Sequence, residues 1–358
     1  MTGSKEGMKK EYSKYTYRKI LFIIACIVAT AMMFFVSLCV GTLDLSANEA
    51  ITYFVNHLKG ITYTDEDQIF ADRIIWKYRV PRALFAIIAG LALSVAGAIM
   101  QSVMKNPLAD PYTTGVSSGA LFGAAIAMVL GCTIAGGIGN DLAIVINAII
   151  FALIPILVIV IMAPFFRKSP STLILSGVAV SYLFNSFTSL LLVTTDSATL
   201  TMVYRWQVGS LIDLSWDALP LTTIFTVAGL AIVLPLSGKL NIMALDDKDA
   251  KALGLNIERL RVICLVILAL MTSIVISYVG IIGFVGLVIP HIVRMVLGAD
   301  NKYLLPATGA FGAAFLLGCD ILSRALDVGA SIPVGVITSF IGAPLFLYLI
   351  IRQRRNMW

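Results

Sequence analysis

Charged residues are scarce in this chain of 358 residues. Asp, Glu, Lys and Arg make up 13% of it, whereas hydrophobic residues make up 59%. A soluble domain carries about 25% charged residues, so this chain has too few of them to cover a surface that faces water. The composition therefore excludes a soluble enzyme and a disordered protein, and it indicates a protein that crosses the membrane several times.

Patterns that hold metals or nucleotides are missing as well. The five cysteines occur singly, and neither His57 nor His291 has a cysteine or carboxylate at metal-ligand spacing. The sequence also lacks the GxxxxGK[ST] loop that binds phosphates, because Gly238-Lys239 is followed by Leu240. We therefore expect a protein that is not an enzyme and binds no cofactor, so that any use of ATP falls to a partner subunit.

Long apolar stretches account for most of the chain, and nine of them contain no Asp, Glu, Lys or Arg. They are residues 20–43, 83–104, 111–140, 142–166, 169–195, 218–238, 262–293, 303–319 and 328–351. One bilayer crossing needs about 20 apolar residues. The stretch 262–293 is too long for one straight crossing and carries Gly280-Ile281-Ile282-Gly283 in its middle. We predict two crossings there, and hence an all-α bundle of ten transmembrane helices.

Basic residues set the orientation of this bundle. Both tails are basic, and two tails on the same side require an even number of crossings. In the ten-span topology, 19 of the 26 Lys and Arg residues fall on the inner side and 7 on the outer side, as the positive-inside rule requires. We therefore expect a multi-pass protein of the cytoplasmic (plasma, inner) membrane with both termini in the cytoplasm, and no binding to nucleic acid.

The chain divides accordingly into three parts. Residues 1–19 and 352–358 are predicted to be cytoplasmic tails, and residues 20–351 the ten-span domain, which includes a long inner loop at 238–261. The first apolar run is 24 residues long. The apolar region of a secretory signal peptide is usually about 7–15 residues, so we interpret this run as a retained span rather than a cleaved signal.

Four segments differ from generic apolar sequence. They are Arg79–Ala120, Leu240–Arg261, Gly283–Arg294 and Ile332–Pro344, and they include the runs Asn106-Pro107-Leu108-Ala109-Asp110-Pro111 and Gly283-Phe284-Val285-Gly286-Leu287-Val288-Ile289-Pro290-His291. In this order, the segments resemble the permease subunit of type II ABC importers, a family that takes up iron-siderophores, haem and cobalamin. The resemblance covers residues from about 20 to 351, which is nearly the whole chain.

The resemblance implies a function and a set of partners. It implies a homodimeric permease that binds two ATP-binding ABC subunits, which hold ATP and Mg, and that receives its substrate from an extracytoplasmic binding protein. It favours a ferric siderophore as the substrate, with a permease of the same type for haem or cobalamin as the alternative. The permease itself carries no catalytic site.

The long inner loop is the predicted contact with the ATPase. Its sequence favours an amphipathic helix from Asp246 to Leu253 that ends at Gly254. Aspartate stands at 246 where the family pattern has glycine, and aspartate is a good N-cap. The resemblance assigns ATPase coupling to Leu245, Asp246, Ala250, Leu253 and Gly254. A solvated linker is the alternative.

Arginines at the outer ends of the spans are the predicted contact with the binding protein. The resemblance assigns this role to Arg79, Arg82 and Arg324, and a guanidinium pairs well with the carboxylates of a partner. Anchoring to lipid headgroups is the alternative interpretation.

Two further sets of residues complete the predicted site. The resemblance implies a cytoplasmic gate at Asn106, Leu108, Pro170 and Ser171, although the same residue types also favour ordinary turns. The span over 169–195 is the richest in polar side chains, and we expect Ser181, Asn185 and Thr188 to line the pathway. Hydrogen bonding between helices is the alternative role for those three.

Two other classes of membrane protein are the alternatives. An ion-coupled secondary transporter should carry an ionisable residue near the middle of a span, but the span-flanking carboxylates lie towards outer ends: Asp196, Asp217, Asp320 and Asp327. An intramembrane enzyme should carry a catalytic dyad or a metal cluster within the spans, and the sequence has neither.

Overall fold

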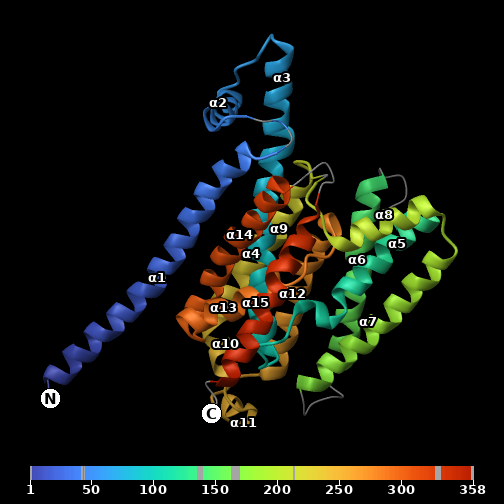
Figure 1. The fold of residues 1–358 in the computed structure, drawn as a ribbon. Helices are drawn as coiled ribbons and strands as arrows, with labels where there is room; N and C mark the ends of the chain where they lie inside the picture. The colour runs from blue at the N-terminus through green and yellow to red at the C-terminus, as the bar shows by residue number, and fades with distance from the viewer. Residues whose placement is uncertain are drawn as a thin grey trace.

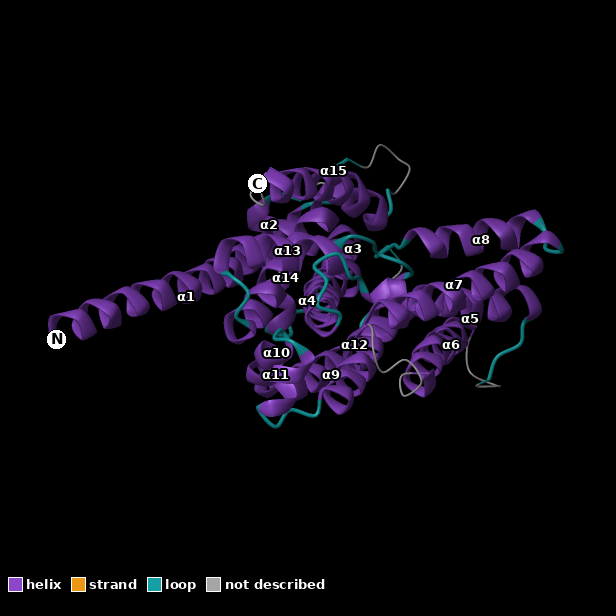
Figure 2. Ribbon diagram, turned by 90° about the horizontal axis from the view of Figure 1, so that it is seen from below, coloured by secondary structure: helices purple, strands orange, loops and turns teal. Residues whose placement is uncertain are grey.

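The computed structural model describes residues 2–355 apart from 42, 44, 135–139, 163–169, 213 and 327–331, and it gives no side chains for 2–14, 140, 170–174 and 352–355. Every regular element within the described residues is a helix (Figures 1 and 2). The α-helices are α1 Thr2–Cys39, α2 Ala47–Leu58, α3 Glu66–Arg73, α4 Val80–Val103, α5 Val116–Leu130, α6 Asn140–Met162, α7 Pro170–Val193, α8 Ser197–Val208, α9 Ala218–Val233, α10 Ser237–Met243, α11 Asp247–Ala252, α12 Ile257–Val279, α13 Val285–Leu297, α14 Asn301–Ala325 and α15 Val334–Arg355. A π-helical segment, Ile74–Arg79, joins α3 to α4, and 3-10 turns occupy Pro111–Thr114 and Leu234–Leu236.

Helix α4 lies at the centre of the bundle. It packs against α9, α12, α13 and α14, while α1 leans on α14 from outside (Figure 1). A second group consists of α5 to α8, in which α5 contacts the other three helices, and α12 connects the two groups through contacts with α5 and α6. In the most apolar 18-residue stretch of Glu66–Val103, 78% of the residues are buried. In the corresponding stretches of α1 and α7, only 17% are buried.

Glycines allow α4 to touch its neighbours backbone to backbone. A Cβ added at Gly97 would lie 1.8 Å from the carbonyl oxygen of Gly286 in α13, and one added at Gly90 would lie 2.3 Å from that of Gly312 in α14. Such small residues let helices approach closely, which is how membrane helices gain packing energy in the absence of a hydrophobic drive between them. The position of α4 is therefore fixed by contacts that no larger residue permits.

Within the described part of the chain, eight helical segments are long and apolar enough to cross a bilayer. The apolar helices α5 and α13 are shorter, with 15 and 13 residues, so at about 1.5 Å per residue they reach only about 20 Å. A hydrocarbon core is roughly 30 Å thick. The fold is thus a polytopic all-α membrane bundle, as predicted, while the count of ten crossings stays a prediction that requires α5 and α13 to cross as well.

The predicted break within residues 262–293 is confirmed. Helix α12 ends at Val279 and α13 begins at Val285. Gly280 has φ +74° and packs so closely on the carbonyl of Trp206 that any Cβ would collide with it. Both conditions require glycine at this position, and they explain why the long apolar run bends here.

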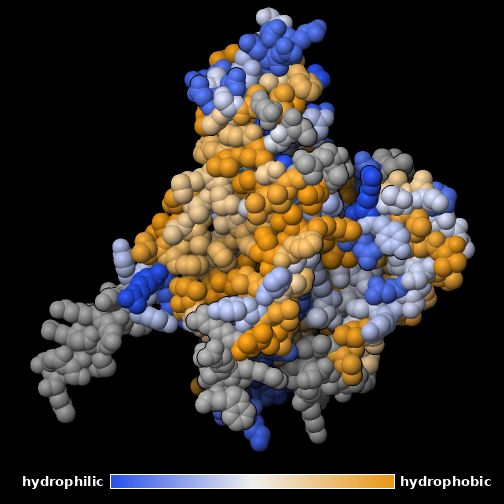
Figure 3. All heavy atoms as spheres, in the orientation of Figure 1, coloured by the Kyte–Doolittle hydropathy of each residue, from blue (hydrophilic) through white to orange (hydrophobic). Residues whose placement is uncertain are grey.

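The segment between the first two predicted spans is more helical than the apolar pattern indicates. Residues between the first two spans form α2 and α3, which project from one end of the bundle where hydrophilic residues gather (Figure 3). Ser46 and Glu49 form a capping box at the start of α2, and the Asp65 side chain caps α3. The helix that contains the second predicted span begins before it, because it runs without interruption from Glu66 to Val103.

Replacing Gly97 by alanine tests the central packing. The added methyl overlaps the Gly286 carbonyl, so α4 and α13 must separate, and we expect a loss of at least about 1–3 kcal/mol of stability. The control is Gly283→Ala, where the nearest atom to a new Cβ is 3.9 Å away. Thermal unfolding of the purified variants, followed by tryptophan fluorescence, measures the effect. Equal midpoints for both variants would contradict the packing described here.

Candidate functional site

The segment between α9 and α12 folds as the two short helices α10 and α11. The backbone of Asp247 donates a hydrogen bond of 2.8 Å to the Asp246 side chain at the start of α11, and Gly254 follows the helix with φ +80°. The predicted helix over Asp246–Leu253 is therefore confirmed, with Asp246 as its N-cap. Ala250 is buried, whereas Leu245 and Leu253 are exposed, so exposed apolar side chains flank α11 on both sides at this end of the bundle.

Lys105 connects this segment to the end of α4. Its ammonium group donates hydrogen bonds of 2.5 Å to the carbonyl of Leu245 and of 2.7 Å to the carboxylate of Asp247. The hydrogen bond from Lys105 holds the pKa of Asp247 below its usual value, so this carboxylate is fully ionised at neutral pH. The sequence analysis missed Lys105, because its partners lie 140 residues away and no local pattern marks them.

The predicted gate residues lie in two separate loops. Lys105 has a positive φ of 49°, and the Asn106 side chain accepts a hydrogen bond of 2.9 Å from the backbone of Leu108, which closes a turn. Leu108 is exposed. Pro170 and Ser171 begin α7, but their side chains lie outside the described part of the chain. The described contacts explain the Asn106 turn, and gating stays a prediction.

The predicted pathway residues all lie on α7, but on different sides of it. The hydroxyls of Ser181 and Thr188 donate to the carbonyls of Gly177 and Phe184 within the same helix. Thr188 is buried against the rest of the chain, whereas Asn185 is exposed. Asn185 is thus exposed, whereas Ser181 packs beside Gly115 on the same face of α7 as Thr188, and the lining of a pathway stays a prediction.

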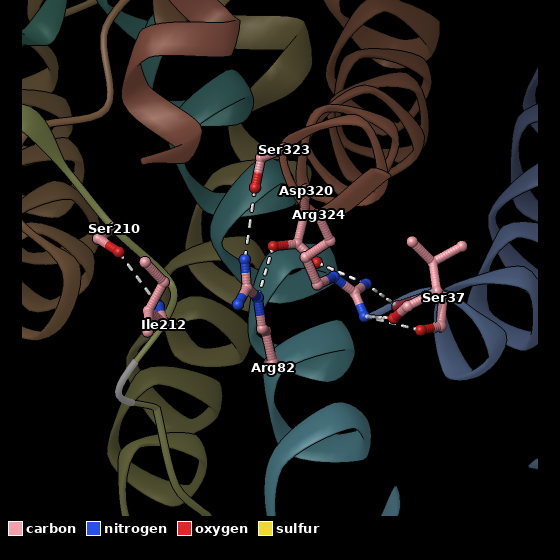
Figure 4. A network of polar contacts seen from close by, with 8 residues as sticks. Ser37, Arg82, Ser210, Ile212, Asp320, Ser323 and Arg324 are labelled. Carbon is pink, nitrogen blue, oxygen red and sulfur yellow. Dashed lines mark hydrogen bonds and ion pairs between the residues drawn. The ribbon is translucent and has the colours of Figure 1, made fainter. Parts of the chain in front are cut away.

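Two of the three predicted docking arginines, Arg82 and Arg324, meet at the opposite end of the bundle (Figure 4). Asp320 of α14 is fully buried and accepts hydrogen bonds from Arg82 at 2.7 Å and from Arg324 at 2.8 Å. Arg324 also donates to the carbonyls of Ser37 and Val40 and to the Ser37 hydroxyl. One buried carboxylate therefore joins α4 to α14, and Arg324 carries the connection on to α1.

Arg79 binds the same end of α1 from another side. It is 5% exposed and donates to the carbonyls of Leu38 and Leu43, both at 2.6 Å. The last carbonyls of a helix have no partner within the helix, and cations are favoured there. Arg79 and Arg324 supply both hydrogen-bond donors and positive charge to the carbonyls at the end of α1. All three arginines therefore have partners inside the chain, and their contact with a binding protein stays a prediction.

Replacing Asp320 by asparagine tests this network. The change leaves two buried guanidinium groups facing each other without a countercharge, which we expect to cost about 3–5 kcal/mol. The control is Asp217→Asn, which removes an exposed carboxylate at the start of α9. Thermal unfolding midpoints should fall by several degrees for Asp320→Asn and stay unchanged for the control. Equal midpoints would show that the network carries no stability.

Comparison with known proteins places the whole chain in one family. A model of the FecCD transport family matches residues 27–352. A hemin transport system permease of Yersinia pestis is 34% identical over 283 residues, which are 79% of this chain and 84% of the relative. An Fe(3+)-citrate import system permease of Bacillus subtilis is 33% identical over 340 residues, or 95% and 96% of the two chains. A vitamin B12 import system permease of Vibrio cholerae is 33% identical over 281 residues, or 78% and 83%.

The fold agrees with this relationship. A solved structure of an ABC transporter assigned to the metal-chelate type, in an inward-facing conformation, matches with a TM-score of 0.79 and 30% sequence identity. The match covers 92% of this chain and 98% of that one. The chain therefore belongs to the FecCD transport family and is the membrane-spanning permease subunit of an ABC importer.

Proposed function

We propose that this permease imports a ferric siderophore across the cytoplasmic membrane as one half of a homodimer. Two separate ABC subunits bind ATP and Mg and drive the cycle, and an extracytoplasmic binding protein delivers the substrate. The α11 end faces the cytoplasm, together with both termini, and the α2 and α3 end faces outward. The chain itself performs no covalent chemistry.

The observation that carries this proposal is the two-helix segment α10–α11 and its link to α4. Leu245 and Leu253 are exposed apolar side chains beside a helix too short to be stable alone, which suits contact with an ATPase. Lys105 binds both the segment that leads into α11 and its first residue. A displacement of α11 is therefore passed directly to the end of α4 and to the adjoining turn at Asn106.

The homodimer is supported by the faces of α7 and α15. Among the described residues, both helices expose large apolar side chains. They are Leu175, Tyr182, Leu183, Phe187, Leu190 and Val193 on α7, and Phe340, Ile341, Leu347, Tyr348 and Ile351 on α15. We propose that two copies meet along these helices and that the exposed Asn185 lines the pathway between them. Removing these faces from lipid gains close packing, the main source of association energy between membrane helices.

The substrate class is supported by the relatives. Three of them are named for the transport of hemin, ferric citrate and vitamin B12, and each of these is a metal held in an organic chelate. A ferric siderophore belongs to the same chemical class. An ion gradient as the driving force is not favoured, because Asp320 is committed to two arginines and lies near the end of α14.

Uptake by the reconstituted transporter tests the proposal. The chain is placed in proteoliposomes with the proposed ATPase subunits and the proposed binding protein. Radiolabelled ferric siderophore, hemin and cobalamin are then offered with ATP or with a proton or sodium gradient. We expect ATP-dependent uptake of the ferric siderophore. Uptake of hemin or cobalamin alone would show that the proposed substrate is wrong. Uptake driven by an ion gradient without ATP would contradict the proposal of an ATP-driven importer.

Gly254 provides a sharp variant for the same assay. Valine at 254 must adopt a φ of +80°, which costs an L-residue about 1–2 kcal/mol and distorts the end of α11. We expect loss of ATPase binding or of ATP-driven uptake. The matched control is Gly238→Val, an identical change within α10 at another site where a Cβ meets no atom within 4 Å. Full activity of both variants would remove α11 from the coupling pathway.

A further inference from the structure

A groove about 590 Å³ in volume runs along the outside of the bundle between α1 and α9. Helix α1 packs on α14 and α4, and α9 packs on α4, but α1 and α9 are not packed against each other in the part of the chain that the structure describes. Helices α4 and α14 therefore form the floor of the groove. Small-molecule sites measure about 300–1,000 Å³, so the groove is large enough for a ligand. The importer cycle described above makes no use of it.

Apolar side chains line this groove from end to end. Its walls include Ile23 and Ile27 from α1 and Leu230 from α9. Thr30 is the one polar side chain among the described residues that line the groove, and its hydroxyl donates a hydrogen bond of 2.8 Å to the carbonyl of Cys26 within α1. These side chains offer neither a charge nor a free donor, so the part of a ligand that lies in the groove must be apolar.

The groove is open to the lipid side and is about as long as one leaflet is deep. Ile27, Phe35 and Leu234 line it and are 56%, 43% and 38% exposed, so chains of the bilayer can enter from the side. In Figures 1 and 2, α1 slants away from the bundle toward its N-terminal end. From Ile23 to Phe35, α1 rises about 18 Å, and one leaflet of a hydrocarbon core roughly 30 Å thick measures about 15 Å. A single acyl chain therefore matches the groove.

Basic residues gather at the end of the groove that lies toward α11. Lys19 precedes Ile23 by one turn of α1, and Lys302 precedes the lining residue Leu305 by one turn of α14. Their ammonium groups lie 4.6 and 5.7 Å from the centre of the Tyr303 ring. Neither lysine forms an ion pair with a carboxylate of the described residues. This end of the groove therefore carries positive charge.

That charge is not cancelled nearby. Asp300 is the carboxylate closest to Lys302 in the sequence, and its Oδ1 accepts hydrogen bonds from Asn241 at 2.7 Å and from the backbone of Lys302 at 3.1 Å. The chain before Lys19 adds more basic residues than acidic ones: Lys5, Lys9, Lys10, Lys14 and Arg18 against Glu6 and Glu11. Basic segments beside the cytoplasmic end of a span attract anionic lipid headgroups.

We propose that the groove binds an anionic phospholipid of the inner leaflet. One acyl chain lies in the groove, and the phosphate group lies beside the exposed Lys302, where the charge of Lys19 adds to the attraction. The lipid fills the space between α1 and α9 and supplies packing to α1, of whose most apolar stretch only 17% is buried. The choice of the inner leaflet rests on the orientation proposed above. The binding itself does not, because it is measured where both ends of the bundle are accessible.

Binding is measured by native mass spectrometry on the full chain, purified in detergent and titrated with phosphatidylglycerol or with phosphatidylcholine of the same acyl chains. We expect the first phosphatidylglycerol to bind at least about tenfold more tightly than the first phosphatidylcholine, a difference of about 1.4 kcal/mol. Lys302→Gln should lose most of this preference. Lys248→Gln, the same change at an exposed lysine of α11, should keep it. Equal affinity of the unchanged chain for the two lipids would overturn the proposal.

Filling the groove tests the place of the acyl chain. Ala31 lines the groove and is exposed, so Ala31→Phe should weaken binding of the first phosphatidylglycerol at least about tenfold. The matched control is Ala25→Phe, an identical change at an exposed position of α1 that does not line the groove, and it should bind like the unchanged chain. Ala310→Phe fills the groove from α14 and keeps the test decisive if Ala31→Phe fails to fold.

The same spectra separate the other occupants. They report the number of chains in each complex, so a loss of dimers in Ala31→Phe without a loss of lipid would assign the groove to a second copy of the chain and overturn the proposal. A preference that depends on Lys302 but survives both groove-filling variants would also overturn it, because the headgroup would then bind without an acyl chain in the groove. The assay contains no ATPase and no binding protein, so its failure is distinguishable from failure of the proposed function.

Discussion

Backbone contact between α4 and its neighbours is the constraint on which the rest of the structure depends. Gly97 touches Gly286 and Gly90 touches Gly312 without any side chain between them, so α4 has one allowed position between α13 and α14. The same helix presents Arg82 near one end and Lys105 just past the other, roughly 35 Å apart at 1.5 Å per residue. Charged residues near opposite ends of the bundle are thus carried by the same helix and the residues that follow it.

At each end of α4, one basic side chain binds residues that are distant in the sequence: Arg82 at one end and Lys105 at the other. At one end, Asp320 pairs with Arg82 and Arg324, and arginines complete the carbonyls that end α1. At the other end, Lys105 completes a carbonyl and a carboxylate next to α11. Polar groups near a membrane are costly without partners, so these contacts both stabilise the bundle and determine which elements move together.

Sequence reasoning predicted what is local and missed what is distant. The length of the apolar runs predicted the long helices, and Gly280 marked the break before α13. Asp246 and Gly254 predicted the two ends of α11 to within one residue. The capping box of Ser46 and Glu49 was a readable signal for α2 that the analysis did not use. By contrast, Lys105 and Leu245 lie 140 residues apart and Arg82 and Asp320 lie 238 residues apart, and only the packing of the helices brings them together.

The ratio of substrate uptake to ATP hydrolysis in a Lys105→Met transporter tests the central claim most directly. If Lys105 passes the movement of α11 to α4, hydrolysis continues while uptake per ATP falls severalfold. The matched variant Lys248→Met, which changes an exposed lysine on α11 itself, should keep the normal ratio. An unchanged ratio in Lys105→Met would contradict the account, because α11 would then reach the pathway by a route that does not include α4.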